Sequence, residues 1–303
     1  MPEIDVLVVG GINSDYVARG EALPAPGQTC TGETFLETLG GKGANQAIAA
    51  ARLHARVALV GAIGNDERGP RLVAVLRDAG IVVRVSTRRD SATGAALIHL
   101  DRKSERQILA VLGANQRLEI RDVETACDAI GHARVVVAQL EVPLECALSA
   151  FQWARRVGAQ TILDPAPAMP LADSVLTLVD VIRANASEAE TLTGIRVENR
   201  ETARRAAQQV LERGVGTVIV QGGDKGNLLL TRAGEHWLPL LQVETVDLTG
   251  AGDAFVGTLA ASLARGRSML EAVTLANAAA AVETTTLGAE RPPVTEEQLR
   301  KLI

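Results

Sequence analysis

The segment VALVGAI (57–63), followed by RGPRLVAVLRDA (68–79), shows the pattern that decides the fold. The first run is continuously apolar and of strand length, which is typical of a strand buried on both faces. The second run places its apolar residues at helical spacing, and Gly80 follows it as a typical C-terminal glycine of a helix. A buried strand joined to an amphipathic helix is one half of a βαβ unit, from which parallel sheets are built.

The same alternation continues from this unit in both directions along the chain. Apolar runs predict strands at 6–9, 135–140, 161–163, 179–183 and 217–221. Helical patterns lie at 44–53, 143–157, 200–213, 251–265 and 268–283. Strands that alternate with helices of this length predict an α/β fold, with a doubly wound, mostly parallel sheet flanked by helices.

Two segments interrupt the alternation and predict a small β subdomain. Residues 12–39 contain Pro and Gly but no long helical pattern, and residues 93–112 show two strand patterns around a charged turn. The α/β core is therefore expected to comprise residues 1–11, 40–92 and 113–303. Because exposed strands as apolar as GAALIHL and RQILAVL would be prone to aggregation, we expect this subdomain to cover a ligand or a partner chain.

The composition argues against several classes of function. The chain has 303 residues, of which 47% are hydrophobic and 2% aromatic, and a formal net charge of −5. This balance provides no electrostatic footprint for nucleic acid or for an anionic membrane. The three cysteines lack metal-binding spacing, and the sequence shows no signal peptide or membrane-spanning run. We therefore expect a soluble, cytoplasmic protein with reduced thiols.

The first candidate binding loop is LGGKGAN (39–45), which leads directly into a predicted helix. Its glycines let the backbone approach a ligand closely, and the start of the helix offers unpaired N–H donors. The spacing matches neither a Walker A loop nor a dinucleotide-binding fingerprint. Taken alone, the loop favours a binding site, with a tight turn between a strand and a helix as the alternative.

The second candidate is VDLTGAGDAFVGTL (246–259). Gly250, Ala251 and Gly252 open a helix whose first amides can stabilise the negative charge of a transferring phosphoryl group. Asp253 lies at the same helix start and can accept the proton of an attacking hydroxyl. An acid in the first turn of a helix also has an ordinary structural role. The preceding G-A-G favours the catalytic interpretation, with Asp253 as the general base.

The third candidate is QGGDKG (221–226), which directly follows the predicted strand TVIV. Ligands bind at the carboxyl ends of the strands in open α/β sheets, and a glycine-rich loop there is a common binding element. A simple turn is the alternative, and the presence of the other two motifs favours a nucleotide-binding loop.

In this order, the three loops resemble those of the ribokinase family, within the B-type phosphofructokinase superfamily of carbohydrate kinases. The resemblance covers nearly the whole chain. Its motifs are VVGGINSD (8–15), P-x-P-G-Q-T (24–29), GGKGANQA (40–47), TGAALI (93–98), LGAN (112–115), QLE (139–141), DPAPA (164–168), N-x-x-E-A-E-x-L-T-G (185–194) and DLTGAGD (247–253). It implies transfer of a phosphoryl group from ATP to the primary hydroxyl of a sugar, with D-ribose as the first candidate and D-ribose 5-phosphate as the product.

Residue by residue, the resemblance implies four sets of ligands. The sugar hydroxyls are expected at Asn13, Asp15, Gly41, Lys42, Asn45, Glu141 and Asp253. ATP is expected at Asn185, Gln221, Gly222, Gly223, Asp224, Gly226, Ala251, Gly252 and Asn277. Glu188 is expected to hold Mg²⁺ through water. A monovalent cation, usually K⁺ in this family, is expected at Asp247, Thr249, Glu283, Thr286 and Gly288.

The resemblance also implies that the β subdomain is a lid over the sugar and joins two subunits into a homodimer. Two departures from the family pattern are Ala184, where Pro is common, and Pro292, where ribokinases often have Ser near the cation loop. The Lys42 side chain either touches the ligand or lies on the surface while the loop backbone binds.

Two other functions remain open at this point. A nucleoside or pseudouridine kinase of the same fold would need aromatic groups to stack on a base, and aromatic residues are scarce in this chain. A non-catalytic sugar-binding sensor would be expected to have lost Asp253 or the preceding G-A-G, and both are present.

Overall fold

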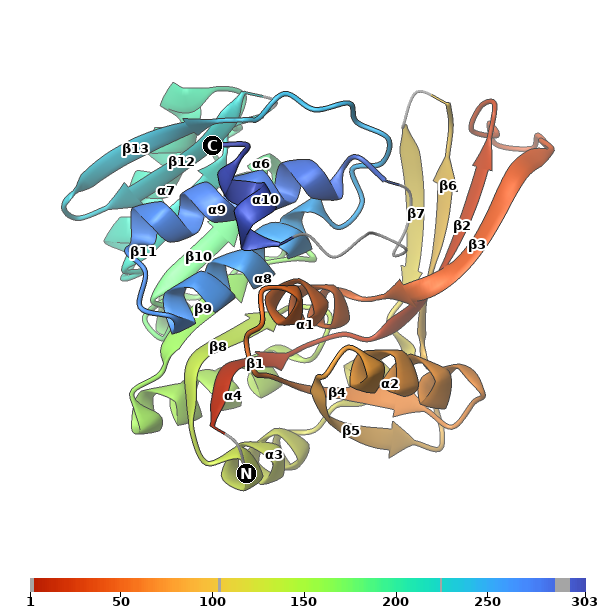
Figure 1. The fold of residues 1–303 in the computed structure, drawn as a ribbon, viewed down its shortest axis with the longest axis horizontal. Coiled ribbons are helices and arrows are strands. Elements are labelled where there is room, and N and C mark those ends of the chain that lie inside the picture. Colours follow the sequence, from red (N-terminus) through yellow and green to blue (C-terminus); the bar gives the residue numbers. More distant parts are fainter. Residues whose placement is uncertain (1–2, 103–104, 224, 287–294) are drawn as a thin grey trace.

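A nine-stranded sheet forms the centre of the molecule, and helices cover both of its faces (Figure 1). The computed structural model describes residues 3–102, 105–223, 225–286 and 295–303. The strand order is β13-β12-β11-β10-β9-β8-β1-β4-β5. The bounds are β1 (Ile4–Val9), β4 (Val57–Gly64), β5 (Val82–Arg88), β8 (Ala133–Gln139), β9 (Gln160–Asp164), β10 (Val181–Ala184), β11 (Thr217–Gln221), β12 (Gly226–Thr231) and β13 (Gly234–Pro239).

The pairing of these strands shows where a ligand site is expected. All neighbours from β5 to β11 pair in parallel, whereas β12 and β13 extend the edge in antiparallel orientation. The chain winds outward from β1 in both directions, through β4 on one side and β8 on the other. Ligands of doubly wound sheets bind at such a switch point, beyond the carboxyl ends of the strands.

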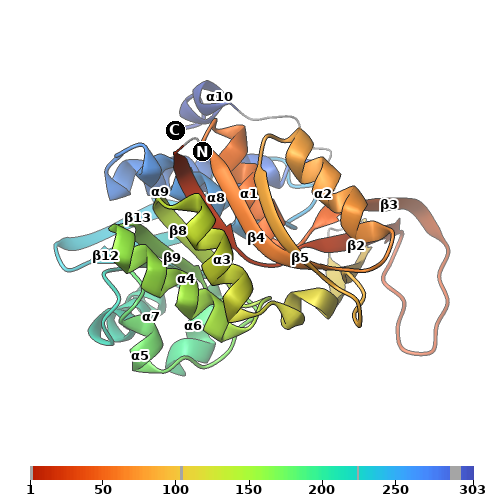
Figure 2. The ribbon, with the colours of Figure 1, turned by 90° about the horizontal axis from the view of Figure 1, so that it is seen from below.

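The helices form two layers, one on each face of the sheet (Figure 2). One layer contains α1 (Lys42–Arg52), α2 (Arg68–Asp78), α8 (Ala251–Ala264), α9 (Met269–Glu283) and the short α10 (Glu296–Arg300). The other contains α3 (Ile120–Ile130), α4 (Leu144–Val157), α5 (Asp173–Leu176), α6 (Ala186–Thr193) and α7 (Arg200–Glu212), and the 3₁₀ turn η1 (Gly113–Arg117) leads into it. Across the described parts of the chain, no helix is long and apolar enough to span a bilayer.

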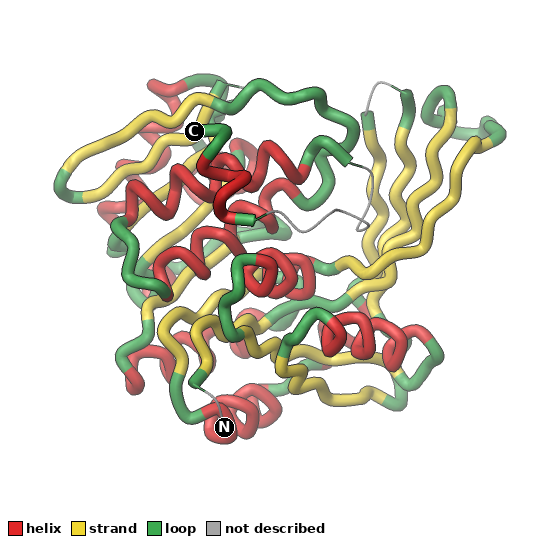
Figure 3. The backbone as a smooth tube through the Cα atoms, viewed as in Figure 1, coloured by secondary structure: helices red, strands yellow, loops and turns green. Residues whose placement is uncertain are grey.

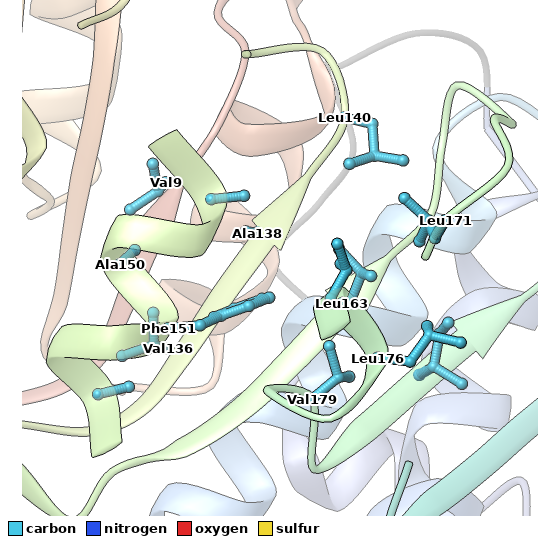
Figure 4. Packing of buried hydrophobic residues seen from close by; sticks show 14 of the residues in the cluster. Val9, Val136, Ala138, Leu140, Ala150, Phe151, Leu163, Leu171, Leu176 and Val179 are labelled. Atoms are coloured by element: carbon cyan, nitrogen blue, oxygen red, sulfur yellow. The ribbon is translucent and has the colours of Figure 1, made fainter. Parts of the chain in front are cut away.

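Each face of the sheet has its own hydrophobic core. Phe151, on α4, is fully buried in one cluster with Val136 and Ala138 of β8 (Figure 4). Phe255, on α8, is fully buried in the cluster on the opposite face. Apart from Trp153, Cys127 and Cys146 in the first cluster, both cores are otherwise built from Ala, Val, Leu and Ile, because aromatic residues are only 2% of the chain.

A second sheet of four strands stands beside the core (Figures 1 and 3). Its order is β3-β2-β6-β7, with bounds β2 (Asn13–Gly20), β3 (Gly32–Gly40), β6 (Gly94–Leu100) and β7 (Arg106–Val111). These strands come from the two segments expected to form the β subdomain. The inner face carries a small buried cluster of Val17, Ala96, Ile98 and Leu100. The outer face presents apolar side chains to solvent, as described below.

The structure confirms the fold class and most of the predicted elements. The helix predicted from residue 44 begins at Lys42, and the strand predicted at 179–183 is β10, shifted by up to two residues. The elements that were not predicted include β5, α3, α6, the hairpin of β12 and β13, and the short helices η1, α5 and α10. In β5, an edge strand, polar residues alternate with half-buried valines, so no continuous apolar run is present.

Candidate active site

The loop before α1 and the start of α8 lie against each other at the edge of the sheet that contains the ends of β1 and β8. Gly41 has a φ of 88°, a left-handed conformation in which the chain turns directly from β3 into α1. A Cβ on Gly43 would lie 2.6 Å from the carbonyl carbon of Gly10, so only glycine lets α1 pack this closely on the end of β1. The structure thus brings the first two predicted loops into one site.

Asp253 lies at the centre of this site and is only 6% exposed. One carboxylate oxygen accepts a hydrogen bond from Asn45 Nδ2 (3.1 Å), and the other accepts one from Gln46 Nε2 (3.0 Å). Gly250 caps α8 with a left-handed φ of 81°. The first intrahelical hydrogen bond of α8 runs from Ala254 N to Gly250 O, so the earlier amides are not consumed inside the helix. A base therefore sits directly beside a group of amides that can bind an anion.

Gln46 connects the carboxylates of this site, although the sequence motifs assigned it no role. Its Nε2 donates to Asp253 and also to Asp164 Oδ2 at 2.8 Å, and its Oε1 accepts from Gln139 Nε2 at 2.6 Å. Asp164 and Gln139 are the last residues of β9 and β8, and both are buried. These partners belong to the recognised DPAPA and QLE motifs, but only the folded chain shows that they meet.

Lys42 takes part in the same network, so its side chain points into the site and not away from it. Its Nζ lies 3.6 Å from Asp164 Oδ2 and 3.7 Å from Asp253 Oδ1. Burial alone would lower the pKa of Lys42, but the nearby carboxylates of Asp164, Asp253 and Glu141 raise it above its ordinary value. The ammonium group therefore stays charged and offsets part of the negative charge of the site.

Asn13 and Asp15 belong to β2 of the small sheet, and with Glu141 they supply polar groups on that side of the site. Asn115 fixes Asn13 by donating from Nδ2 to Asn13 Oδ1 at 2.7 Å, and Glu141 Oε2 accepts from the backbone N of Lys42 at 2.8 Å. Burial raises the pKa of Asp15 to about 7, and the Asp253 charge adds to the effect. Burial likewise raises the pKa of Glu141 to about 7, although Lys42 opposes it. These acids can hold a ligand that supplies hydrogen-bond donors.

Replacing Asp15 by Asn is expected to stabilise the unliganded protein at pH 8. The raised pKa means that the folded state holds this proton more tightly than the unfolded chain, so stability falls as pH rises from about 4 to 7. The neutral amide avoids that cost, and we expect a gain of about 1–3 kcal/mol at pH 8 and little change at pH 5. Thermal unfolding at both pH values measures it.

Asp66 provides a control of opposite sign for this experiment. Burial alone would raise the pKa of Asp66, but hydrogen bonds from Thr93, Arg68 and Gly69 lower it well below its usual range. Its stabilisation is present above the unfolded-state pKa and is lost in acid, so Asp66→Asn should destabilise the protein at pH 8. If Asp15→Asn also destabilises it at pH 8, the Asp15 carboxylate is not a strained, buried charge.

The residues predicted to bind a nucleotide lie along the neighbouring strands. Asn185 and Glu188 form a capping box at the start of α6, in which Glu188 Oε2 accepts from Asn185 N at 2.8 Å. Asn277 is buried and joined to the end of β13 by a 2.8 Å hydrogen bond from Nδ2 to Pro239 O. Gly222 and Gly226 lie so close to Trp237 that a Cβ on either would meet its ring at less than 3.0 Å. Gln221 and Gly223 are described, whereas Asp224 lies outside the described residues.

Three of the five predicted cation ligands line a larger cavity. Asp247, Thr249 and Glu283 line a space of about 590 Å³ that also reaches Asp15 and Asn45. Asp247 Oδ1 accepts a 2.8 Å hydrogen bond from Thr249 N. Thr286 ends a described segment, and Gly288 and Pro292 lie outside the described residues. Within the described ranges, no three His, Cys, Asp or Glu side chains gather as a metal-binding group.

The fold and the site together define a sugar kinase, and comparison with known proteins agrees. Residues 3–296 match the model of the pfkB family of carbohydrate kinases. The chain therefore belongs to the pfkB family of carbohydrate kinases, as the sequence motifs had indicated.

Within this family, the chain is similar to ribokinases in particular. It is 36% identical over 297 residues to the ribokinase of Haemophilus influenzae, covering 97% of each chain. It is 40% identical over 264 residues to the ribokinase of Mus musculus, covering 86% of this chain and 81% of the relative. A deoxyribokinase of Salmonella typhi is 34% identical over 259 residues, with 85% of each covered. The structure of Arabidopsis thaliana ribokinase complexed with ribose and ATP superimposes with a TM-score of 0.85 at 29% identity, covering 99% of this chain and 98% of that one.

Proposed function

We propose that this chain transfers the γ-phosphoryl group of ATP to the primary hydroxyl of a pentose, with D-ribose as the first candidate. The position of Asp253 carries the proposal, since its carboxylate accepts hydrogen bonds from Asn45 and Gln46 of α1 and lies in the first turn of α8, beside the first amides of that helix. The similarity to ribokinases, one of them solved with ribose and ATP, supports the choice of substrate and donor.

In the proposed mechanism, Asp253 is the general base. As the sugar hydroxyl oxygen forms a bond to the γ-phosphorus, its proton passes to the Asp253 carboxylate, and the bond from the γ-phosphorus to the β–γ bridging oxygen breaks. ADP leaves with the electron pair of that bond. The amides around Gly250, Ala251 and Gly252 stabilise the charge on the phosphoryl oxygens during transfer. The step needs no covalent intermediate on the enzyme.

The sugar is held on the opposite side of the base. Asp15, Glu141 and Asn13 supply buried acceptors and an amide, and the backbone at Gly41 and the side chains of Lys42 and Asn45 complete the set. A site built from buried polar groups rejects analogues that lack a hydroxyl, because its donors and acceptors are then left unpaired. Since Asp15 and Glu141 have a pKa of about 7, sugar binding should strengthen as pH rises through 7.

The residues present fit the ions that this family implies. Both oxygens of Glu188 accept hydrogen bonds from Asn185, and a carboxylate has further lone pairs that can accept from a water bound to Mg²⁺. Mg²⁺ would neutralise charge on the ATP phosphates. Asp247 is buried beside Thr249 and supplies oxygen donors suited to K⁺. We include both ions in the proposal.

A panel of sugars tests the proposal directly. ADP release is measured with ribose, deoxyribose, fructose, adenosine and pseudouridine at equal concentration. The greatest kcat/KM with ribose is the expected result. A preference for deoxyribose would place the chain with its deoxyribokinase relative. A preference for a nucleoside would contradict the proposal, and the described residues that line the cavity include no aromatic side chain to stack on a base. A chain that binds sugar without releasing ADP would be a sensor.

The small sheet is proposed to be a lid that also joins two subunits in the cytoplasm. Its outer face exposes Phe35 (67%), Leu97 (45%), Leu109 (64%) and Val111 (59%). Leu97 and Leu109 are register partners and therefore share a face. Apolar side chains gathered on one face are typical of a surface that another chain covers. A second copy of this lid is the proposed partner.

Replacing Leu109 by Lys is expected to convert the dimer into monomers. The charge would lie on the apolar face, where burying a lysine against another copy of the lid would be unfavourable. Sedimentation at micromolar concentration measures the mass of the wild type and the variant. Leu270→Lys is the control, because Leu270 is a 40% exposed leucine on α9, outside the lid. A monomeric wild type, or a dimeric Leu109 variant, would contradict the lid interface.

A further inference from the structure

Arg183, the third residue of β10, is a buried arginine at the carboxyl end of a central strand. Its side chain is only 7% exposed. It stands two residues before Asn185 and pairs in register with Ile219 of β11. The position therefore places a positive charge at the edge of the sheet where the proposed nucleotide site lies. None of the predicted roles included this residue.

Three neighbours hold the guanidinium of Arg183 in place. Its Nη2 donates to Gln221 Oε1 at 3.3 Å, and its central carbon lies 5.3 Å from the centroid of the Phe255 ring. Its Nη1 lies 2.9 Å from the position that a Cβ on Gly252 would occupy. The guanidinium thus lies against the first turn of α8, beside the amides proposed to bind a phosphoryl group. The glycine at position 252 leaves room for it there.

The charge of Arg183 has no close anionic partner in the described part of the chain. Its Nε is buried without a hydrogen-bond partner, and no described Asp or Glu forms an ion pair with it. The Asp164 carboxylate interacts electrostatically with Arg183, but it already forms an ion pair with Lys42 and a hydrogen bond with Gln46. Burying a guanidinium charge without a partner is unfavourable. Because no described residue supplies an anion to this guanidinium, a bound anionic ligand is the partner that it fits.

We propose that Arg183 binds an oxygen of the γ-phosphate of ATP, together with the first amides of α8. The inference rests on the proposed function, because it identifies the anion as the phosphate that is transferred. The planar guanidinium matches the geometry of phosphate oxygens and forms short, charge-assisted hydrogen bonds with them. An arginine at this place stabilises the charge on the phosphoryl oxygens as transfer proceeds. Phe255 and Gln221 orient it before ATP arrives.

The test compares two nucleotides that differ only at the γ-phosphate position. The affinities of ADP and of the non-hydrolysable analogue AMP-PNP, both with Mg²⁺, are measured by calorimetry for the wild type and for Arg183→Met. Loss of the γ-phosphate contact should weaken AMP-PNP about 10-fold and change ADP less than about 2-fold. Turnover with ribose should fall by about 10-fold or more. Arg183→Lys should recover part of the AMP-PNP affinity, because it restores the charge but not the planar fork.

Arg204→Met removes an exposed arginine of α7 that pairs with Glu235, and should change neither affinity. If Arg183→Met weakens the affinities for ADP and AMP-PNP equally, Arg183 binds another phosphate of the nucleotide or serves only to stabilise the fold. Unchanged AMP-PNP affinity would exclude the contact. If Arg183→Met does not fold, Arg183→Lys carries the same comparison. If the wild type binds AMP-PNP more tightly than ADP but phosphorylates no sugar, the proposed function is wrong. The affinities of Arg183→Met for the two nucleotides still decide whether Arg183 contacts the γ-phosphate.

Discussion

Replacing Asp253 by Asn is expected to lower kcat at least about 10²-fold while sugar and nucleotide still bind. The amide has the size of the carboxylate and keeps one oxygen for the donors of Asn45 or Gln46, but it cannot accept the proton of the attacking hydroxyl. Single-turnover kinetics with ribose measures the chemical step. Calorimetric titration with ribose and with AMP-PNP measures binding.

Asp128→Asn is the matched control, because Asp128 is an exposed acid on α3, on the opposite face of the sheet. It should leave kcat and both affinities unchanged. If Asp253→Asn turns over as fast as the wild type, Asp253 is not the general base. Loss of sugar binding together with turnover would show that the carboxylate serves mainly to hold the substrate.

The sequence predicted the central sheet well because its strands are buried on both faces. Runs such as VALVGAI have no polar residue, and the structure buries every residue of β4. At the edge, β5 contains Arg84 and Ser86 and is only half buried, so the same criterion fails. Helix α6 was not predicted because it follows Asn185 within a motif that was interpreted for its ligands, and it is only eight residues long.

The candidate site was predictable where its residues belong to glycine-rich loops at helix starts. Lys42 and Asn45 at the start of α1 and Asp253 at the start of α8 directly follow such glycines, and the structure brings them together. Gln46 and Arg183 were not found, because the residues that they contact are far away in sequence. Gln46 and Asp253, for example, are 207 residues apart. Only the topology of the sheet brings these partners to one edge.

Replacing Gln46 by Glu is expected to destabilise the unliganded protein by about 3–5 kcal/mol at pH 8. The new carboxylate would keep the acceptor for Gln139 but would face Asp164 and Asp253 in place of the amide that now donates to both. Lys42 alone cannot neutralise three buried carboxylates. Because one of them can take up a proton, the folded-state pKa of the group is raised, and the loss of stability should shrink as pH falls toward 5.

Gln208→Glu shows how much of that effect comes from burial. Gln208 lies on the exposed face of α7 and donates to Glu212 Oε1 at 2.9 Å, so the same substitution also creates a pair of like charges there. Water screens that pair, and the cost on a helix surface is only about 0.2–0.5 kcal/mol. Chemical denaturation of both variants at pH 5 and pH 8 compares them. Equal and small effects would mean that the network around Gln46 is open to solvent, and the Asp253 carboxylate would then lack the dry, oriented setting that the proposed mechanism requires.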